Sequence, residues 1–231
     1  IRECLNPIYD LERLLAKVSY KTINPKDMIA IRESLRMIPH IKQSIMDCKV
    51  PLIEKLYNDI DPLIDIFDKI DRAIEEDPPF SVREGGIIKD GYNEGVDYLR
   101  KSKSEGKNWL ANLESEEKEK TGIKTLKVKY NKVFGYYLEV SKSFIDMVPA
   151  DYIRKQTLSN AERYTTEKLK ELEDTILNAQ DKLCSLEFDL FEEIRVYIEE
   201  NLLRIQKTAK ALAYLDVFCS LSYVAESNRY V

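Results

Sequence analysis

In the first third of the chain, hydrophobic residues recur at helical spacing in short segments separated by prolines. Three prolines follow a residue that can accept hydrogen bonds from first-turn amides: Asn6–Pro7, Asn24–Pro25 and Asp61–Pro62. We expect a helix to open at each pair, and together these helices predict a compact helical body. Their apolar faces would carry Ile8, Leu11, Leu14, Leu15 and Val18, then Met28, Ile31 and Leu35, then Leu63, Ile66, Phe67 and Ile70.

Residues 78–90 interrupt this pattern. Two prolines open the stretch, Gly85 and Gly86 follow, and a β-branched pair, Ile87 and Ile88, comes next. Because glycine and proline mark loops, we interpret the stretch as a connector that contains one short strand.

The remaining apolar pattern predicts two long helices. The first covers residues 92–120 and places Val96, Leu99, Leu110 and Leu113 at the a and d positions of a seven-residue repeat, which Lys103 and Gly106 interrupt. The second begins near Thr166, a suitable cap, and its apolar residues step by threes and fours: Leu169, Leu172, Ile176, Ala179, Leu183, Leu186 and Leu190. At 1.5 Å per residue, each helix would be roughly 45–50 Å long. We expect them to lie antiparallel with the intervening segment at their tip; the alternative is two core helices of an ordinary bundle.

Between the two helices the apolar period changes to two residues. Leu126, Val128 and Tyr130 alternate with lysines, and a second alternating run covers residues 136–142. Residues 131–135 would form the turn, and a third strand is expected from Gln156 to Tyr164. The segment therefore predicts a small antiparallel sheet.

Charge is distributed unevenly along the chain. The composition, 44% apolar and 33% charged residues, is typical of a soluble protein with a real core, and the net charge is −5. Residues 121–165 nevertheless contain eight lysines or arginines against four acids. A polyanion would therefore bind at this segment.

The polar residues of the expected sheet suit phosphate contacts, which position a protein on DNA without reading its bases. The candidate DNA-binding residues are Lys127, Lys129, Asn131, Lys132, Arg154, Lys155, Asn160 and Arg163. The alternative is that a small exposed sheet needs lysines for solubility and to discourage edge pairing. Strand alternation alone does not decide which lysines face DNA.

No catalytic, metal or cofactor site is expected in this chain. The four cysteines are far apart, and His40 has no partner for a metal or a nucleophile. Gly106–Lys107 lacks the preceding glycine of a phosphate-binding loop, since position 101 is Lys101. With no cationic leader and no apolar run of about 18 residues, we expect a cytoplasmic protein with reduced thiols and no membrane contact.

Four segments resemble the MutS family of DNA mismatch repair proteins. YDLERLLAKVSYKTINP (residues 9–25) resembles the start of the family's core domain, and GGIIKDGYNEGVDYLR (85–100) is similar to the entry into its descending lever helix. LKVKYNKVFGYYLEVSK (126–142) and YIRKQTLSNAERYTTEKLKELED (152–174) resemble its clamp and the root of its ascending lever.

The resemblance implies a mainly α fold, with a multi-helix core, two long antiparallel lever helices and a small antiparallel β clamp at their tip. Residues 1–120 would be the core, connector and descending lever, residues 121–165 the clamp, and residues 166–231 the ascending lever and its return into the core. It also implies a mismatch recognition dimer whose clamp contacts the double-stranded DNA backbone and is coupled to an ATPase domain. That domain, with ATP and magnesium, would lie in the full-length parent, which would also bind a second MutS subunit and downstream repair proteins near the nucleoid.

Three other functions stay open at this point. The two long helices could form a mechanical coiled-coil arm whose tip binds a protein, as in chromosome-organising ATPases. The chain could also come from a MutS paralogue that works outside mismatch repair. An enzyme that acts on its own is the third.

Overall fold

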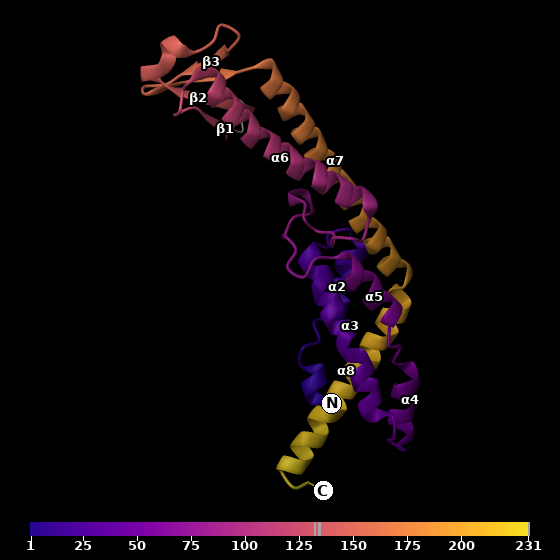
Figure 1. Cartoon of the computed structure of the whole chain (residues 1–231). Helices are drawn as coiled ribbons and strands as arrows, with labels where there is room; N and C mark the ends of the chain where they lie inside the picture. The colour runs from indigo at the N-terminus through magenta and orange to yellow at the C-terminus, as the bar shows by residue number, and fades with distance from the viewer. Residues whose placement is uncertain (132, 134, 231) are drawn as a thin grey trace. The chain divides into compact units, whose positions relative to one another are not determined.

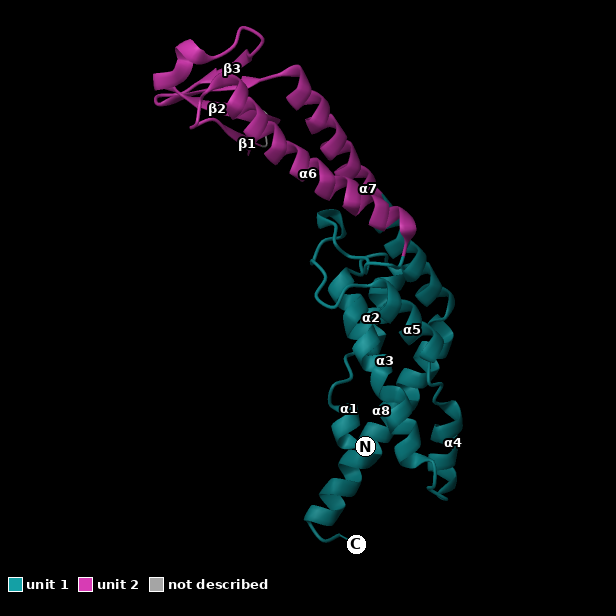
Figure 2. Ribbon diagram, in the orientation of Figure 1, with its two compact units in different colours: residues 1–92, 186–231 teal, residues 93–185 magenta. Residues whose placement is uncertain are grey.

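The computed structural model describes the chain except for residues 132, 134 and 231 and the side chain at position 107. The chain divides into two compact units (Figure 2). The first unit comprises residues 1–92 and 186–231, and the second unit comprises residues 93–185. Helix α7, Glu167–Glu200, contributes residues to both units.

The first unit is helical (Figure 1). Its elements are α1 (Arg2–Leu5), α2 (Leu11–Ser19), α3 (Pro25–Ile45), α4 (Pro51–Asp59), α5 (Ile64–Ala73), the short 3-10 helix η1 (Val82–Glu84), the end of α7, and α8 (Leu202–Ser227). Apolar residues predicted to face inward, among them Leu14, Met28 and Ile70, are almost fully buried. The predicted helical body is therefore confirmed.

Only one of the three predicted proline-marked helix starts is confirmed. At α3 the Asn24 side chain accepts a hydrogen bond from the Asp27 amide at 2.9 Å, and the Asp27 carboxylate accepts one from the Asn24 amide at 3.2 Å. This reciprocal capping, with Pro25 at the first helical position, is the arrangement that the sequence predicts.

The starts at Asn6–Pro7 and Asp61–Pro62 are wrong. Helix α2 begins only at Leu11, because Asp10 caps it by accepting from the Arg13 amide at 3.0 Å. Helix α5 begins at Ile64 after Leu63, whose φ of 53° is left-handed. In that turn the Asp61 side chain accepts from the Leu63 amide, so Asp61 shapes the turn and does not cap the helix.

The predicted strand in the connector is reduced to a single β-bridge, Ile74 with Ile88. Two backbone hydrogen bonds of 2.8 Å flank it, from Glu75 to the Ile87 carbonyl and from Lys89 to the Ala73 carbonyl. The buried Glu187 carboxylate also accepts from the Gly86 amide at 2.6 Å. The connector is thus held to α7 as well as to the end of α5.

A buried arginine joins α3 to the segment around α5. The Arg32 side chain is 3% exposed and lies 2.6 Å from Glu33, 3.1 Å from Asp71 and 2.7 Å from Glu76. The hydrogen bond from Arg32, helped by one from Lys89, lowers the pKa of Glu76 to about 2. Removing one of these acidic partners would leave the buried Arg32 charge less well compensated, which destabilises the fold.

In the second unit, both predicted long helices are confirmed. Helix α6 spans Glu94–Thr121, and the Asn93 side chain caps it by accepting from the Gly95 and Val96 amides. Helix α7 starts after Thr166, whose hydroxyl accepts from the Leu169 amide at 3.2 Å. Thr166 is the cap that the sequence predicts, whereas the sequence predicts the first helix from its apolar repeat and not from Asn93.

The two helices run antiparallel, side by side (Figure 1). On their surface, Glu116 of α6 lies 2.5 Å from Lys168 of α7. Ten residues earlier, α6 brings Gly106 so close to α7 that a Cβ at this position would lie 2.6 Å from Ile176 Cγ1. At Gly106, which interrupts the apolar repeat in the sequence, α6 therefore leaves no room for a side chain unless Ile176 shifts.

A four-stranded antiparallel sheet connects α6 to α7 in the chain. Its strands are β1 (Lys127–Asn131), β2 (Gly135–Ser141), β3 (Ile153–Thr157) and β4 (Ala161–Thr165), in the order β1-β2-β4-β3. The 3-10 helix η2 (Lys142–Met147) follows β2.

The first two predicted strands are confirmed, whereas the prediction of a single third strand from Gln156 to Tyr164 is wrong. The chain reverses there, since the Leu158 amide donates to the Ala161 carbonyl at 2.9 Å and the intervening Ser159 and Asn160 suit a turn.

One face of the sheet packs on the helices and forms the core of the second unit. The buried members of that core are Leu110, Leu113, Ile123, Leu126, Leu138, Val140, Tyr152, Tyr164, Leu169 and Ile176. The residues come from both helices and from the sheet, so neither part buries its apolar face alone. The opposite face of the sheet is left for polar residues.

Glu76→Gln should reduce the free energy of unfolding at pH 7 and reduce it less at pH 3, where part of the contribution of the ionised carboxylate is already lost. A lowered pKa in the fold contributes stability above the ordinary value of 4.5, and this contribution is lost as pH falls toward about 2. Urea unfolding at the two pH values measures the difference. Glu54→Gln, an exposed glutamate on α4, is the control. An equal effect of Glu76→Gln at both pH values would refute the coupling to Arg32.

Gly106→Ala should destabilise the protein by about 1–3 kcal/mol, the usual cost of overpacking. The sign is informative, because alanine in a helix is otherwise favoured over glycine by about 1 kcal/mol. Ile176→Ala costs stability of its own because the residue is in the core, but in that background Gly106→Ala should cost less, since the side chain that the new methyl group meets is gone. Ser104→Ala, on the exposed side of α6, is the control, and stabilisation by Gly106→Ala would contradict the close approach.

Candidate nucleic-acid interface

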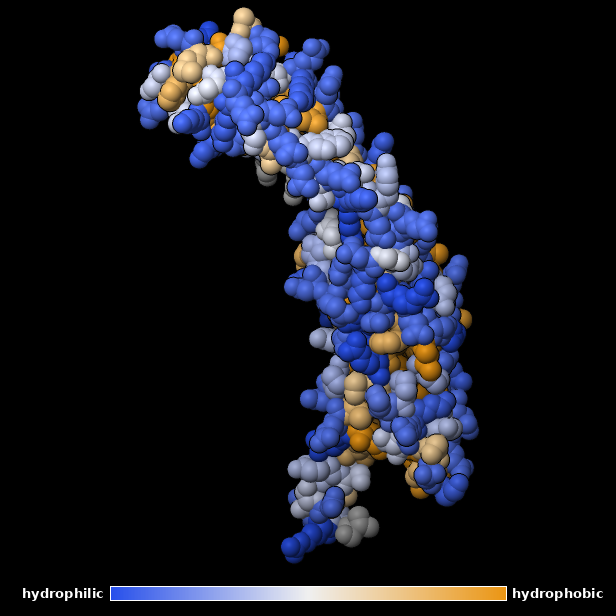
Figure 3. Space-filling model, viewed as in Figure 1, coloured by the Kyte–Doolittle hydropathy of each residue, from blue (hydrophilic) through white to orange (hydrophobic). Residues whose placement is uncertain are grey.

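The outer face of the sheet is basic. Strand alternation puts Lys127 and Lys129 on the same face, and the register pairs them with Glu139 and Tyr137 on β2. Glu139 is in turn opposite Arg163 on β4. In Figure 3 the surface over the strands of the second unit is mainly hydrophilic, with a few apolar side chains among the charged ones.

A polar network crosses this outer face. Lys129 Nζ lies 2.7 Å from Glu139 Oε1, and Arg163 Nε lies 3.8 Å from Glu139 Oε2. Arg163 also donates to Gln156 on β3 at 2.7 Å, and its guanidinium lies 4.4 Å from the centre of the Tyr137 ring. The network therefore spans all four strands and contains a single carboxylate, Glu139, among the side chains named here.

The two cations bound to Glu139 differ in their access to solvent. The Lys129 side chain is 46% exposed, whereas that of Arg163 is 19% exposed. The hydrogen bond to Glu139 raises the pKa of Lys129, so its ammonium group stays charged. Lys127 is exposed on the same face. Lys127 and Lys129 can thus reach an anion directly, while Arg163 packs beneath the surface on Tyr137.

The other predicted DNA-binding residues lie elsewhere on the sheet. Arg154 is exposed on the edge strand β3 and lies 3.5 Å from Glu162, and the half-buried Lys155 sits where the β3–β4 register shifts. Asn160 is exposed in the turn between β3 and β4, and its carbonyl accepts from the Lys142 amide. Asn131 ends β1 and accepts from the Val133 amide at 2.8 Å. Lys132 lies outside the described residues.

Sequence reasoning missed the acids that attach the sheet to the helices. Glu114 of α6 accepts from the Val128 amide at 2.9 Å, and Glu173 of α7 accepts from the Tyr136 amide at 3.2 Å. Glu117 of α6 accepts from the Tyr152 hydroxyl at 2.6 Å. In the sequence these residues are indistinguishable from the solvated glutamates around them, so no local signal marks them.

Two tyrosines in the core of the second unit have perturbed hydroxyl groups. Burial, followed by the hydrogen bond to Glu117, raises the pKa of Tyr152 well above its ordinary value. Burial and the hydrogen bond to Glu162 raise the pKa of Tyr164 to about 12. The fold therefore favours both phenols in their neutral form.

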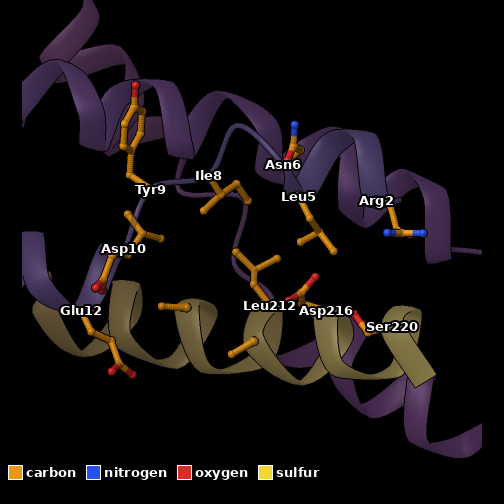
Figure 4. A pocket seen from close by; sticks show the side chains of 13 residues that line it. Arg2, Leu5, Asn6, Ile8, Tyr9, Asp10, Glu12, Leu212, Asp216 and Ser220 are labelled. Atoms are coloured by element: carbon orange, nitrogen blue, oxygen red, sulfur yellow. The ribbon is translucent and has the colours of Figure 1, made fainter. Parts of the chain in front are cut away.

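The first unit has a separate pocket of about 570 Å³ between the segment around α1 and α2 and one side of α8. Figure 4 shows Asp10 and Glu12 at one end and Arg2 with Ser220 at the other. Asp10 already caps α2.

Among the residues that the structure describes, no group of three or more His, Cys, Asp or Glu side chains could hold a metal ion. No helix in the described part of the chain is both long and apolar enough to cross a membrane.

Comparison with known proteins gives one consistent result. The model of MutS family domain IV matches residues 91–182, which is nearly the range of the second unit. Over the whole chain, the DNA mismatch repair protein MutS of Lachnoclostridium phytofermentans is 61% identical, that of Caldanaerobacter subterraneus 54% and that of Acetivibrio thermocellus 50%. The chain spans 25%, 27% and 26% of these proteins, about a quarter of their length.

Tyr164→Phe should make the protein less sensitive to alkali. A raised pKa contributes stability below the ordinary value of 10.0, and this stability is lost as pH rises toward about 12. We expect the variant to be about 1–2 kcal/mol less stable at pH 8, because it lacks the hydrogen bond to Glu162. The difference from the parent chain should shrink by pH 11 in urea unfolding. Tyr98→Phe, at a tyrosine of α6 that is 71% exposed, is the control. Parallel slopes for the parent and Tyr164→Phe would exclude the coupling.

Proposed function

Because this chain belongs to the MutS family of DNA mismatch repair proteins, we propose that its four-stranded sheet is a clamp that contacts the backbone of duplex DNA. Helices α6 and α7 are then levers that connect the clamp to the rest of the complete protein. The observation that carries the proposal is the exposed basic face formed by Lys127 and Lys129.

The chemistry of that face favours phosphate over base recognition. Lysine is a flexible point charge that attracts phosphate oxygens without a fixed hydrogen-bonding pattern. The ion pair with Glu139 orders the Lys129 side chain, which remains 46% exposed. Binding should therefore be weak, on the order of 10⁻⁴ to 10⁻⁶ M at physiological salt, and indifferent to a mismatch.

The eight predicted residues take different parts in this proposal. Lys127 and Lys129 contact phosphates, and Arg163 supports them through Glu139 and Tyr137. Arg154 and Lys155 offer a second group of cations at the β3 edge. Asn131 at the end of β1 and Asn160 in the turn between β3 and β4 would add neutral contacts, and Lys132, which lies outside the described residues, would add a further cation.

We also propose how the parts of this chain serve the complete protein. Residues 1–120 would be core, connector and descending lever, residues 121–165 the clamp, and residues 166–231 the ascending lever and its return. The complete protein would be an ATPase that works in the cytoplasm near the nucleoid, with a second MutS subunit and downstream repair proteins as partners.

The Gly106–Lys107 pair does not suit a phosphate-binding loop for ATP and magnesium. Gly106–Lys107 lies inside α6, with Gly106 packed on Ile176, so it cannot form a loop around a phosphate. Nucleotide binding would therefore belong to another part of the complete protein. The 231-residue chain by itself should show neither nucleotide hydrolysis nor nuclease activity.

Fluorescence anisotropy with a labelled duplex tests the clamp. The double variant Lys127→Glu, Lys129→Glu should weaken binding about tenfold or more. The slope of log K against log salt concentration should become less steep by about the amount expected for the loss of two phosphate contacts. The matched control is Lys101→Glu with Lys170→Glu, which changes the net charge equally on exposed positions of α6 and α7. A homoduplex and a mismatched duplex should bind alike.

Two outcomes would refute the clamp. One is an affinity that falls equally in the test and control variants, because the effect would then reflect net charge alone. The other is an absence of duplex binding at low salt. Salt-insensitive capture of a protein by the same chain would instead favour the mechanical arm with a protein-binding tip.

A further inference from the structure

The β1–β2 hairpin is held by one carboxylate from each long helix. Glu114 Oε2 of α6 accepts from the Val128 amide in β1, and Glu173 Oε1 of α7 accepts from the Tyr136 amide in β2. The same hairpin carries Lys127 and Lys129. The two helices thus reach the basic face through different strands.

On the α6 side, the contact satisfies an amide that the sheet leaves open. β1 is an edge strand, so it has a strand neighbour on one side only. The Glu114 carboxylate accepts a hydrogen bond from the Val128 amide and forms an ion pair with Lys118, whose Nζ lies 2.6 Å away on the same helix. A hydrogen bond to a charged acceptor is stronger than one between neutral groups.

On the α7 side, the contact explains a glycine. Gly135 has a φ of +72°, and a Cβ there would lie 1.6 Å from Glu173 Oε1. Glu173 therefore occupies space that only glycine leaves, directly beside the amide that it binds. A side chain at position 135 would therefore displace Glu173 from the Tyr136 amide.

We propose that Glu114 and Glu173 are positioning residues that set the orientation of the β1–β2 hairpin, and so of Lys127 and Lys129, on the helix pair. The inference rests on the proposed contact between this face and DNA. A displacement of α6 along α7 pulls on β1 and β2 in opposite senses, because each helix holds a different strand. The basic face would then turn with the helices, which gives the levers a physical connection to the DNA contact.

Amide hydrogen exchange, followed by NMR on the 231-residue chain, tests the attachment without DNA. Glu114→Ala should accelerate exchange of the Val128 amide, and Glu173→Ala that of the Tyr136 amide, each by about tenfold or more. The amides of Leu138 and Val140, inside the sheet, should keep their protection. Glu119→Ala and Glu171→Ala, on exposed positions of the same helices, should change neither amide.

Duplex affinity of the same variants tests the positioning role. Removing an acid strengthens attraction to DNA by charge alone, so the alanine variants are compared with Glu114→Gln and Glu173→Gln. Glutamine removes the same charge but retains an acceptor oxygen. We expect the double alanine variant to bind the duplex about 3- to 10-fold more weakly than the double glutamine variant.

Each outcome decides a separate claim. Unchanged exchange of Val128 and Tyr136 in the alanine variants would overturn the attachment. Faster exchange with equal duplex affinity of the alanine and glutamine variants would overturn the positioning role. If the parent chain fails to bind duplex at low salt, the clamp and any role of these residues in DNA contact both fail, while the exchange result still decides whether they hold the hairpin.

Discussion

The sheet of the second unit buries only one of its faces, and its other properties follow from that. Leu138 and Tyr164 turn toward α6 and α7, so the residues that alternate with them must face outward. An outward face in water tolerates lysine, glutamate and arginine, and here the cations prevail around the single carboxylate of Glu139. Burial of one face thus leaves the other polar, and the excess of cations over Glu139 makes it basic.

Long elements with capping residues could be predicted from the sequence, and the register of short ones could not. The two long helices carry a seam, and Thr166 marks the start of α7 by a local hydrogen bond. Asn6 and Asp61 look like equally good caps, yet Asp10 competes successfully with the first, and Leu63 enters a left-handed turn after the second. Which candidate caps a helix depends on tertiary packing, and a single sequence does not show that packing.

Of the candidate site, only the residues whose placement follows from alternation along one strand could be predicted. The period of two places Lys127 and Lys129 on one face, as the register shows. It does not reveal that Arg163 packs on Tyr137, because that contact joins separate strands. Glu114 and Glu173 could not be predicted because their partners are backbone amides, which almost every residue has. Gly135 leaves space for Glu173, but a glycine in a turn does not by itself indicate that contact.

The two outer strands of the sheet are each unsuited to pairing with a further strand. Along β1, the Val128 amide is already taken by Glu114 and the neighbouring side chains are charged. Along β3, the register shift between Arg154 and Gln156 breaks the ladder that an incoming strand would need. Copies of the chain at high local concentration could therefore lie side by side without their sheets fusing into a larger one.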